Sequence, residues 1–129
     1  MEEDRITEII IACAIKVHKA LGPGLLESAY RNALFHELSR WGLSVEIEKA
    51  LPLVYGGIRT NKGYRLDLLV ENAVVVEVKA AKAILPIDLS QMQTYLKLTD
   101  CNVGLILNFN VKWLKEGIKR VIHARPPLR

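Results

Sequence analysis

The spacing of hydrophobic residues changes several times along the chain, and these changes constrain the fold more than any other feature. From Asp4 to Ala20 hydrophobic residues recur every three or four positions, which is typical of an amphipathic helix. A second stretch of this kind runs from Leu25 to Trp41. The segment Gly22-Pro23-Gly24 separates them, and its proline restricts the backbone enough to end the first helix. The sequence therefore predicts two consecutive helices.

The next part of the chain is rich in β-branched residues and predicts strands. We expect these strands at Val45–Tyr55, Tyr64–Val70 and Val74–Ala80. Gly56-Gly57 is a turn signal after the first strand, and a short connection joins the last two as a hairpin. Because proline cannot donate to a strand ladder, Pro52 indicates an edge position or a bulge.

The last third of the chain predicts a helix, a buried strand and one further element. Asp88 is expected to cap a helix that ends near Leu98, and Asn102–Phe109 is an apolar run typical of a buried strand. Trp113 to about Val121 is interpreted as a helix or a helix-to-strand segment. The order α-α-β-β-β-α-β-α predicts an α/β fold with a mixed central sheet flanked by helices.

Length and composition favour one globular domain over residues 1–129. Half of the residues are hydrophobic, which is enough for a core without a disulfide or a structural metal. Cys13 and Cys101 lie in apolar contexts, and no Cys/His cluster suggests zinc. The acidic N-terminus does not resemble a secretory signal, and no apolar run reaches about 18 residues. We expect a cytoplasmic protein without membrane contact.

The net charge of +4 permits nucleic-acid binding without requiring it. The charge is concentrated near the C-terminus, where six basic residues after Asn110 stand against one acid, Glu116. These basic residues are Lys112, Lys115, Lys119, Arg120, Arg125 and Arg129. This segment could contact phosphates, or it could be an ordinary solvated tail.

Two consecutive strands each contain one carboxylate among hydrophobic residues, which is costly unless the charge is paired or bound to a metal. They are Asp67 in "RLDLLV" and Glu77 in "VVVEVK". If residues 71–73 connect the strands, Val70 faces Val74 and Asp67 faces Glu77, with facing Cβ atoms about 5 Å apart. A two-residue connection would instead place the carboxylates on opposite faces. The first register brings them together.

Lys79 lies two residues after Glu77 and therefore on the same face of its strand. Two facing carboxylates repel each other, and Mg²⁺ or Mn²⁺ between them would remove the repulsion. A nearby lysine could orient water or stabilise charge on a phosphate. The alternative is a cross-strand ion-pair network of Arg65, Glu77 and Lys79.

Two further motifs bring polar residues onto helix faces. Gly24, Glu27 and Tyr30 form G-x-x-E-x-x-Y, in which Glu27 and Tyr30 share a face and the helix dipole alone could explain Glu27. Gln91 and Tyr95 are four residues apart on the later helix, where a solvent-facing polar side is the simpler explanation.

The chain resembles the GxxExxY family, a group of small proteins assigned to the PD-(D/E)xK nuclease superfamily. The matching segments follow the family order from about residue 6 to residue 122: "VHKALGPGLLESAY", "YRLDLLV", "VVVEVKA", "LSQMQTYLKL" and "VGLILNF".

The resemblance implies roles for individual residues. Asp67 and Glu77 would bind the metal, Lys79 would be the catalytic lysine, and Glu27 would be a further ligand or its support. Gln91 would complete the catalytic set, and Tyr30 and Tyr95 are candidate substrate-binding residues. Tyr95 and Gln91 match a Gln-x-x-x-Tyr helix motif of exonuclease-like branches; His18 falls in the pattern without a role.

Three functions remain open from the sequence. The first is a Mg²⁺- or Mn²⁺-dependent nuclease that acts on DNA more readily than on RNA. The second is a catalytically silent module that keeps the nuclease fold and binds nucleic acid or protein. The third is a structural protein whose charged hairpin is only an ion-pair network. The wide apolar surface of the first helix (Ile9, Ile10, Ile11) is compatible with a homodimer or with central burial.

Overall fold

The protein is built on one five-stranded sheet with the strand order β1-β2-β3-β4-β5. The structure, a computed structural model, describes residues 1–125, without the side chains of residues 60–63. The strands are β1 (Val45–Tyr55), β2 (Ile58–Val70), β3 (Val74–Lys79), β4 (Val103–Asn108) and β5 (Ile118–Ile122). Only β3 and β4 are parallel neighbours, and the other three pairs are antiparallel. The sheet is therefore mixed, as predicted.

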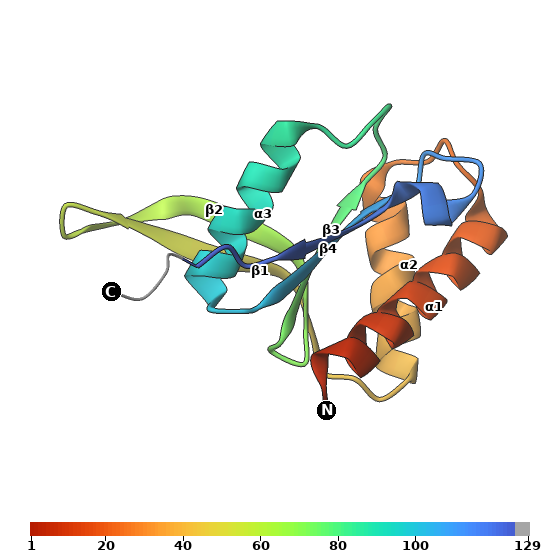
Figure 1. Cartoon of the computed structure of the whole chain (residues 1–129), viewed down its shortest axis with the longest axis horizontal. Coiled ribbons are helices and arrows are strands. Elements are labelled where there is room, and N and C mark those ends of the chain that lie inside the picture. Colours follow the sequence, from red (N-terminus) through yellow and green to blue (C-terminus); the bar gives the residue numbers. More distant parts are fainter. Residues whose placement is uncertain (126–129) are drawn as a thin grey trace.

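Helices cover both faces of this sheet (Figure 1). The helices α1 (Glu3–Leu21) and α2 (Glu27–Arg40) pack on one face, and α3 (Pro86–Thr99) packs on the other. Alternating residues of β3 enter different clusters: Val76 joins the α1/α2 side and Val75 joins the α3 side. This alternation is the period of a strand buried on both faces. The α/β class and the two-sided core are confirmed.

The last predicted element follows the second of its two alternatives, a helix-to-strand segment. A short 3₁₀ turn, η1 (Leu114–Gly117), leads directly into β5, and the full helix over Trp113–Val121 does not form. β5 pairs antiparallel with β4 and satisfies the backbone of that strand on its outer side. Any side chain at Gly117 would collide with the carbonyl oxygen of Asn108, so this approach requires glycine. Pairing with β4 outweighs the local helical signal.

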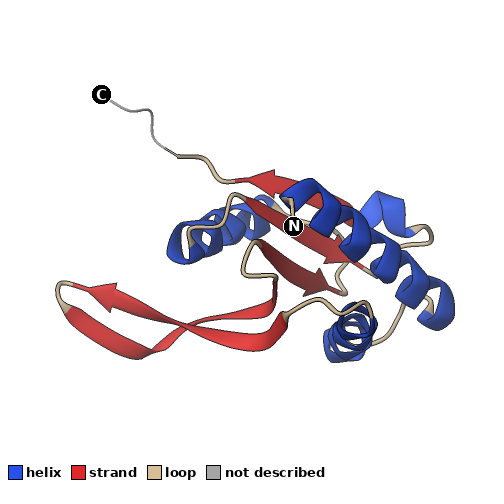
Figure 2. Ribbon diagram, turned by 90° about the horizontal axis from the view of Figure 1, so that it is seen from below, coloured by secondary structure: helices blue, strands red, loops and turns tan. Residues whose placement is uncertain are grey.

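The hairpin of β1 and β2 extends well beyond the rest of the sheet (Figure 2). β2 begins at Ile58, earlier than predicted, because Gly56 and Gly57 both take positive φ angles and form a tight turn. Residues 58–66 of β2 pair only with β1, since β3 pairs with β2 at residues 68–70. The register shifts between Leu51 and Leu53, which confirms the bulge at Pro52.

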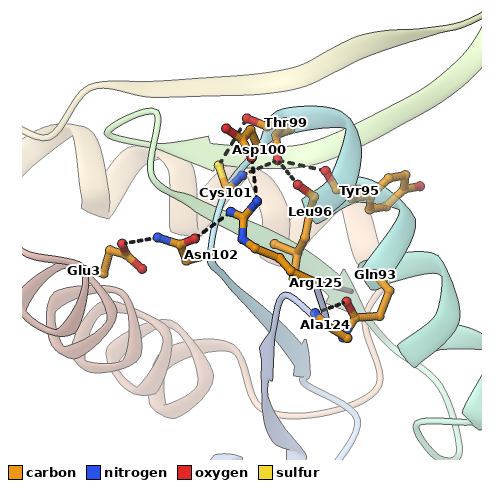
Figure 3. Close-up of polar contacts among 10 residues, drawn as sticks. All are labelled: Glu3, Gln93, Tyr95, Leu96, Thr99, Asp100, Cys101, Asn102, Ala124 and Arg125. Atoms are coloured by element: carbon orange, nitrogen blue, oxygen red, sulfur yellow. Dashed lines mark hydrogen bonds and ion pairs between the residues drawn. The ribbon is translucent and has the colours of Figure 1, made fainter. Parts of the chain in front are cut away.

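Polar contacts near the C-terminus hold α3 against the sheet (Figure 3). The Gln93 amide donates to the carbonyl oxygen of Ile122 at 2.8 Å and accepts from the Ala124 N–H at 2.9 Å. Arg125 donates to Asp100 at 2.8 Å and to Asn102 at 2.7 Å. Arg125 is thus a structural residue, whereas Arg129, of the same basic segment, lies outside the described residues.

The apolar surface of α1 is used inside the molecule. Ile9 and Ile10 are buried, and Ile11 packs partly buried against the same core. Central burial therefore accounts for this surface without a second subunit. Cys13 and Cys101 are buried free thiols. Within residues 1–125, no helix has both the length and the hydropathy needed to cross a membrane.

Candidate active site

The strands separate at Asp67, and this separation creates the candidate site. The β2–β3 pairing follows the predicted register from Val70–Val74 to Leu68–Val76 and ends there. In a regular strand Leu66 and Leu68 would share a face. Here Leu66 packs on the α3 side and Leu68 on the α1/α2 side. The backbone therefore turns at Asp67, so that its side chain can lie between two strands.

Asp67 and Glu77 replace the missing ladder with contacts between carboxylates and backbone. The Val78 N–H donates to Oδ2 of Asp67 at 2.7 Å, and the Asp67 N–H donates to Oε1 of Glu77 at 3.0 Å. Each carboxylate thus reaches across to the opposite strand. Charge-assisted bonds of this kind hold both groups in fixed positions. The structure brings together the two carboxylates that the predicted register places face to face.

Glu77 is held in surroundings that disfavour its charge. Its side chain is only 6% exposed. Burial, and after it the neighbouring charge of Asp67, raise the pKa of Glu77, while the Asp67 N–H and the charge of Lys79 lower it; the net pKa is about 8. Two carboxylates this close together, one buried and one partly buried, are costly without a cation. This cost is the property expected of a pair that binds a divalent metal.

Lys79 lies on the same side of β3 as Glu77 and faces the start of α3. Its Nζ is 3.7 Å from Oδ1 of Asp88, and both side chains are partly buried. The other Asp88 oxygen accepts from the Leu85 N–H at 2.8 Å, and the Asp88 N–H donates back to the Leu85 carbonyl oxygen at 2.9 Å. Asp88, expected only as a helix cap, therefore also positions the lysine.

Arg31 and Glu48 are neighbours of Asp67 that the sequence analysis missed. Arg31 of α2 lies 3.0 Å from Oε1 of Glu48 and 3.8 Å from Oδ1 of Asp67. Glu48 takes a φ of 51° between Ile47 and Lys49, and it lies opposite Asp67 in β1. This left-handed backbone costs about 1 kcal/mol for a residue with a side chain. A non-glycine residue at positive φ was not visible in the sequence.

Tyr95 and Gln91 share the face of α3 that carries Asp88, because the three are spaced three and four residues apart. Tyr95 is almost fully buried and packs edge-on against Tyr64 of β2, with ring centroids 5.6 Å apart. Burial raises the pKa of the Tyr95 hydroxyl, and the charges of Glu77 and Asp67 add to the effect. Tyr95 therefore lies close enough to Asp67 and Glu77 for their negative charges to affect its pKa. Gln91 is half-buried one turn away.

The structure corrects the prediction that Tyr30 contacts substrate. The ring is fully buried and stacks on Phe109, with centroids 4.6 Å apart. The Tyr30 hydroxyl donates to the Gly22 carbonyl oxygen at 2.5 Å and accepts from the Leu25 N–H at 3.1 Å. A side chain without free surface or a free hydroxyl cannot bind a ligand. Tyr30 instead fixes the loop between α1 and α2.

Glu27 is exposed in the first turn of α2. It shares a helix face with Arg31, four residues later, and Arg31 approaches Asp67. Glu27 therefore lies on the correct side of the helix. In the part of the chain that the structure describes, no three His, Cys, Asp or Glu side chains are grouped closely enough to hold a metal. Glu27 therefore does not form a three-residue metal-binding group with Asp67 and Glu77 in this structure.

Asn108 is a further residue that the sequence analysis did not single out. It pairs with Lys79 across β3 and β4 and is buried. Its amide donates to the Ala81 carbonyl oxygen at 2.9 Å and accepts from the Ala81 N–H at 3.1 Å. This double contact fixes the chain as it leaves β3. A polar residue at the end of an apolar strand was the only available signal.

The comparison with protein families agrees with this geometry. A family model described as the PD-(D/E)XK nuclease superfamily matches residues 4–121, which is most of the chain. No curated protein and no solved structure matches the chain significantly. The matched region contains all five strands up to Val121 and both carboxylates of the pair. The chain belongs to the PD-(D/E)XK nuclease superfamily.

Proposed function

We propose that this protein is a divalent-metal-dependent nuclease that hydrolyses phosphodiester bonds of DNA. The carboxylate pair Asp67–Glu77 at the separation of β2 and β3, with Lys79 two residues further on, carries this proposal. Membership of the nuclease superfamily supports the reaction class. Nucleases of this superfamily generally use divalent metal ions.

The donor set fits Mg²⁺ or Mn²⁺, because both ions prefer carboxylate oxygens. Asp67 and Glu77 would hold the ion, and it would relieve the repulsion that raises the pKa of Glu77. Mg²⁺ is often bound by one or two carboxylates, with water and substrate phosphate as its other ligands. A pair without a third protein carboxylate is therefore sufficient. Glu27 is kept in the proposal as a supporting residue because its helix face leads to Asp67.

The bound ion would supply a water with a lowered pKa and would stabilise charge on the phosphate. Lys79 donates hydrogen bonds and holds the attacking water beside the carboxylate pair. Asp88 fixes the Lys79 ammonium group from the opposite side. Gln91 is proposed to orient substrate or water from α3, and Tyr95 to shield the carboxylates from bulk water.

The extended hairpin favours DNA over RNA as the substrate. From Lys49 to Leu66, both included, the sequence contains four basic residues and no acidic residue. The tip of this hairpin is well exposed, with Tyr55 83% accessible. A two-stranded ribbon fits the major groove of B-form DNA, whereas the major groove of an RNA helix is too narrow. The hairpin leaves the sheet at Asp67, so it would guide a duplex toward the carboxylates.

We further propose that the chain is a GxxExxY member of the superfamily and that residues 1–129 act as one domain. Of the motif residues, Gly24 lies in the loop before α2, and Glu27 and Tyr30 lie in the first turn of that helix. Tyr30 holds the loop that delivers Glu27, which gives the motif a structural reason.

The test is cleavage of labelled single- and double-stranded DNA in Mn²⁺ by the wild type, Glu77→Ala and Lys79→Ala. We expect wild-type cleavage, and a loss of at least about a hundredfold in each variant, because each lacks a group that stabilises developing charge. Lys97→Ala, which removes an exposed lysine of α3, is the matched control and should cleave normally.

Absence of cleavage by folded wild-type protein would reject the nuclease proposal. It would favour a silent module that keeps the fold and binds nucleic acid or protein. Cleavage that persists in Glu77→Ala would instead show that the carboxylate pair is not the site.

A further inference from the structure

A cavity of about 700 Å³ lies on the α1/α2 side of the sheet, near the end where β3 and β4 stop. Its walls come from the C-terminal part of α1, the loop before α2, and the segment between β4 and β5. β4 ends at Asn108, the partner of Lys79, so this segment starts next to the candidate active site. A volume of this size is within the range of small-ligand pockets. The lining residues that could contact a ligand are Ile15, Lys19, Pro23, Lys112, Trp113 and Lys115.

The cavity is lined by apolar side chains and by lysine ammonium groups. Three of its lining residues are lysines, and no Asp or Glu of the described residues lines it. Lys112 Nζ lies 5.6 Å from the centre of the Trp113 ring, within the range of a cation–π contact. The indole is 57% exposed. A flat aromatic surface next to ammonium groups suits a ligand that has both a planar ring and negative charge.

The walls of the cavity are held in place by contacts inside the molecule. His18 donates from Nε2 to the Val111 carbonyl oxygen at 2.8 Å and so ties α1 to the segment after β4. The buried Tyr30 hydroxyl holds Gly22 on the opposite wall. A site whose walls are already fixed loses little entropy when a ligand binds. These two contacts give His18 and Tyr30, which both fall in the family pattern, a structural role.

We propose that this cavity binds one nucleotide of the DNA strand outside the cleavage position, on the α1/α2 side of the sheet. The base stacks on Trp113, and Lys19, Lys112 and Lys115 bind its phosphate. This inference rests on the proposed function and extends it, since it names the second place where the strand is held. Bases of any identity stack on an aromatic ring, so the contact holds the strand without selecting a sequence.

The experiment measures binding of a short 5′-phosphorylated single-stranded DNA with a fluorescent label, by anisotropy, in EDTA. Without metal the strand is not cleaved, so binding is observed separately from catalysis. Trp113→Ala should bind about tenfold more weakly, the usual loss for removing one stacking partner. The double variant Lys112→Ala/Lys115→Ala should also bind more weakly and should show a shallower salt dependence, because fewer phosphate contacts remain.

Trp41→Ala is the matched control, since Trp41 is 55% exposed and lies outside this cavity. It should bind like the wild type, and all variants should unfold at similar temperatures. Equal binding by Trp113→Ala and Trp41→Ala would overturn the inference, even if the wild type cleaves DNA. Competition by AMP as strong as by unlabelled strand would also overturn it, because the site would then bind free nucleotides. Selective loss in Trp113→Ala from a protein that never cleaves would support the cavity and reject only the nuclease.

Discussion

The two carboxylates held between strands, Asp67 and Glu77, have different surroundings from those at the starts of α2 and α3, Glu27 and Asp88. Asp67 and Glu77 lie where β2 and β3 separate, and each accepts a backbone N–H of the opposite strand. Glu27 and Asp88 occupy the first turns of α2 and α3. Glu77 is buried, whereas Glu27 is exposed. Asp88 is partly buried, accepts the Leu85 N–H and forms an ion pair with Lys79.

The two pairs of acids therefore differ in what holds them and in how much water surrounds them. Between the strands, the carboxylates are fixed by backbone N–H groups, and the loss of water around Glu77 raises its pKa. A helix start stabilises negative charge through the dipole while water remains nearby, and each such interaction contributes about 0.3–1 kcal/mol. The strand pair is thus the region where a change of charge should have the largest effect.

Glu77→Gln should reveal this cost in the metal-free protein. Folding raises the pKa of Glu77 from 4.5 to about 8, so the folded state favours the protonated form. Below pH 4.5 the group is protonated in both states and carries no penalty; the penalty grows as pH rises and is complete above pH 8. Glutamine keeps the acceptor for the Asp67 N–H without the charge.

The free energy of unfolding in EDTA should therefore be similar for wild type and Glu77→Gln at the acid end. Above pH 8 the variant should be more stable by several kcal/mol, because one pKa unit corresponds to about 1.4 kcal/mol. Denaturant unfolding across pH measures this difference. Parallel stability curves for the two proteins would show that Glu77 carries no buried charge.

The affinity for Mn²⁺ should also distinguish the strand carboxylates from the helix carboxylates, by a smaller free-energy difference than the stability test above. Asp67→Asn removes a proposed ligand charge and should weaken Mn²⁺ binding at least about tenfold, which corresponds to about 1.4 kcal/mol. Glu27→Gln should weaken it only a few-fold, because Glu27 does not join the pair in this structure. Titration calorimetry with Mn²⁺ measures both affinities. Equal losses would make Glu27 a full ligand and would remove the distinction between strand and helix carboxylates.

Much of the strand region could be predicted because its geometry is local. A three-residue connection at Glu71–Ala73 fixes the register, and the two-residue period of a strand then brings Asp67 opposite Glu77. The same local rules located the turn at Gly56 and the bulge at Pro52. These features depend on residues that are near one another in the chain.

The other parts of the site depend on contacts between elements that are far apart in the sequence. Arg31 reaches Asp67 from α2, and Asn108 fixes the exit of β3 from β4. Helical spacing placed Tyr30 on a face of α2 but could not show how deeply that face is buried. The local pattern allowed a strand after Trp113 but did not identify its partner, the edge of β4. The superfamily resemblance identified the motif without giving these contacts.

The smallest difference is expected between the two helix starts themselves. Asp88→Ala removes the acceptor of the Leu85 N–H and should lower the free energy of unfolding by about 1 kcal/mol, as the loss of a helix cap does. Glu27→Ala removes only an exposed charge near the helix dipole and should cost a few tenths of a kcal/mol. Asp88→Asn is the matched control, because its amide oxygen still accepts from Leu85.

Urea unfolding at neutral pH and low salt measures all three variants. Salt should reduce the small Glu27 effect, since an exposed charge is screened, and should leave most of the Asp88 effect, which comes from a backbone hydrogen bond. If Glu27→Ala proved as costly as Asp88→Ala, Glu27 would have to make a contact comparable to the Asp88–Leu85 bond. The start of α2 would then belong with the buried strand pair, and the separation of the two regions would be wrong.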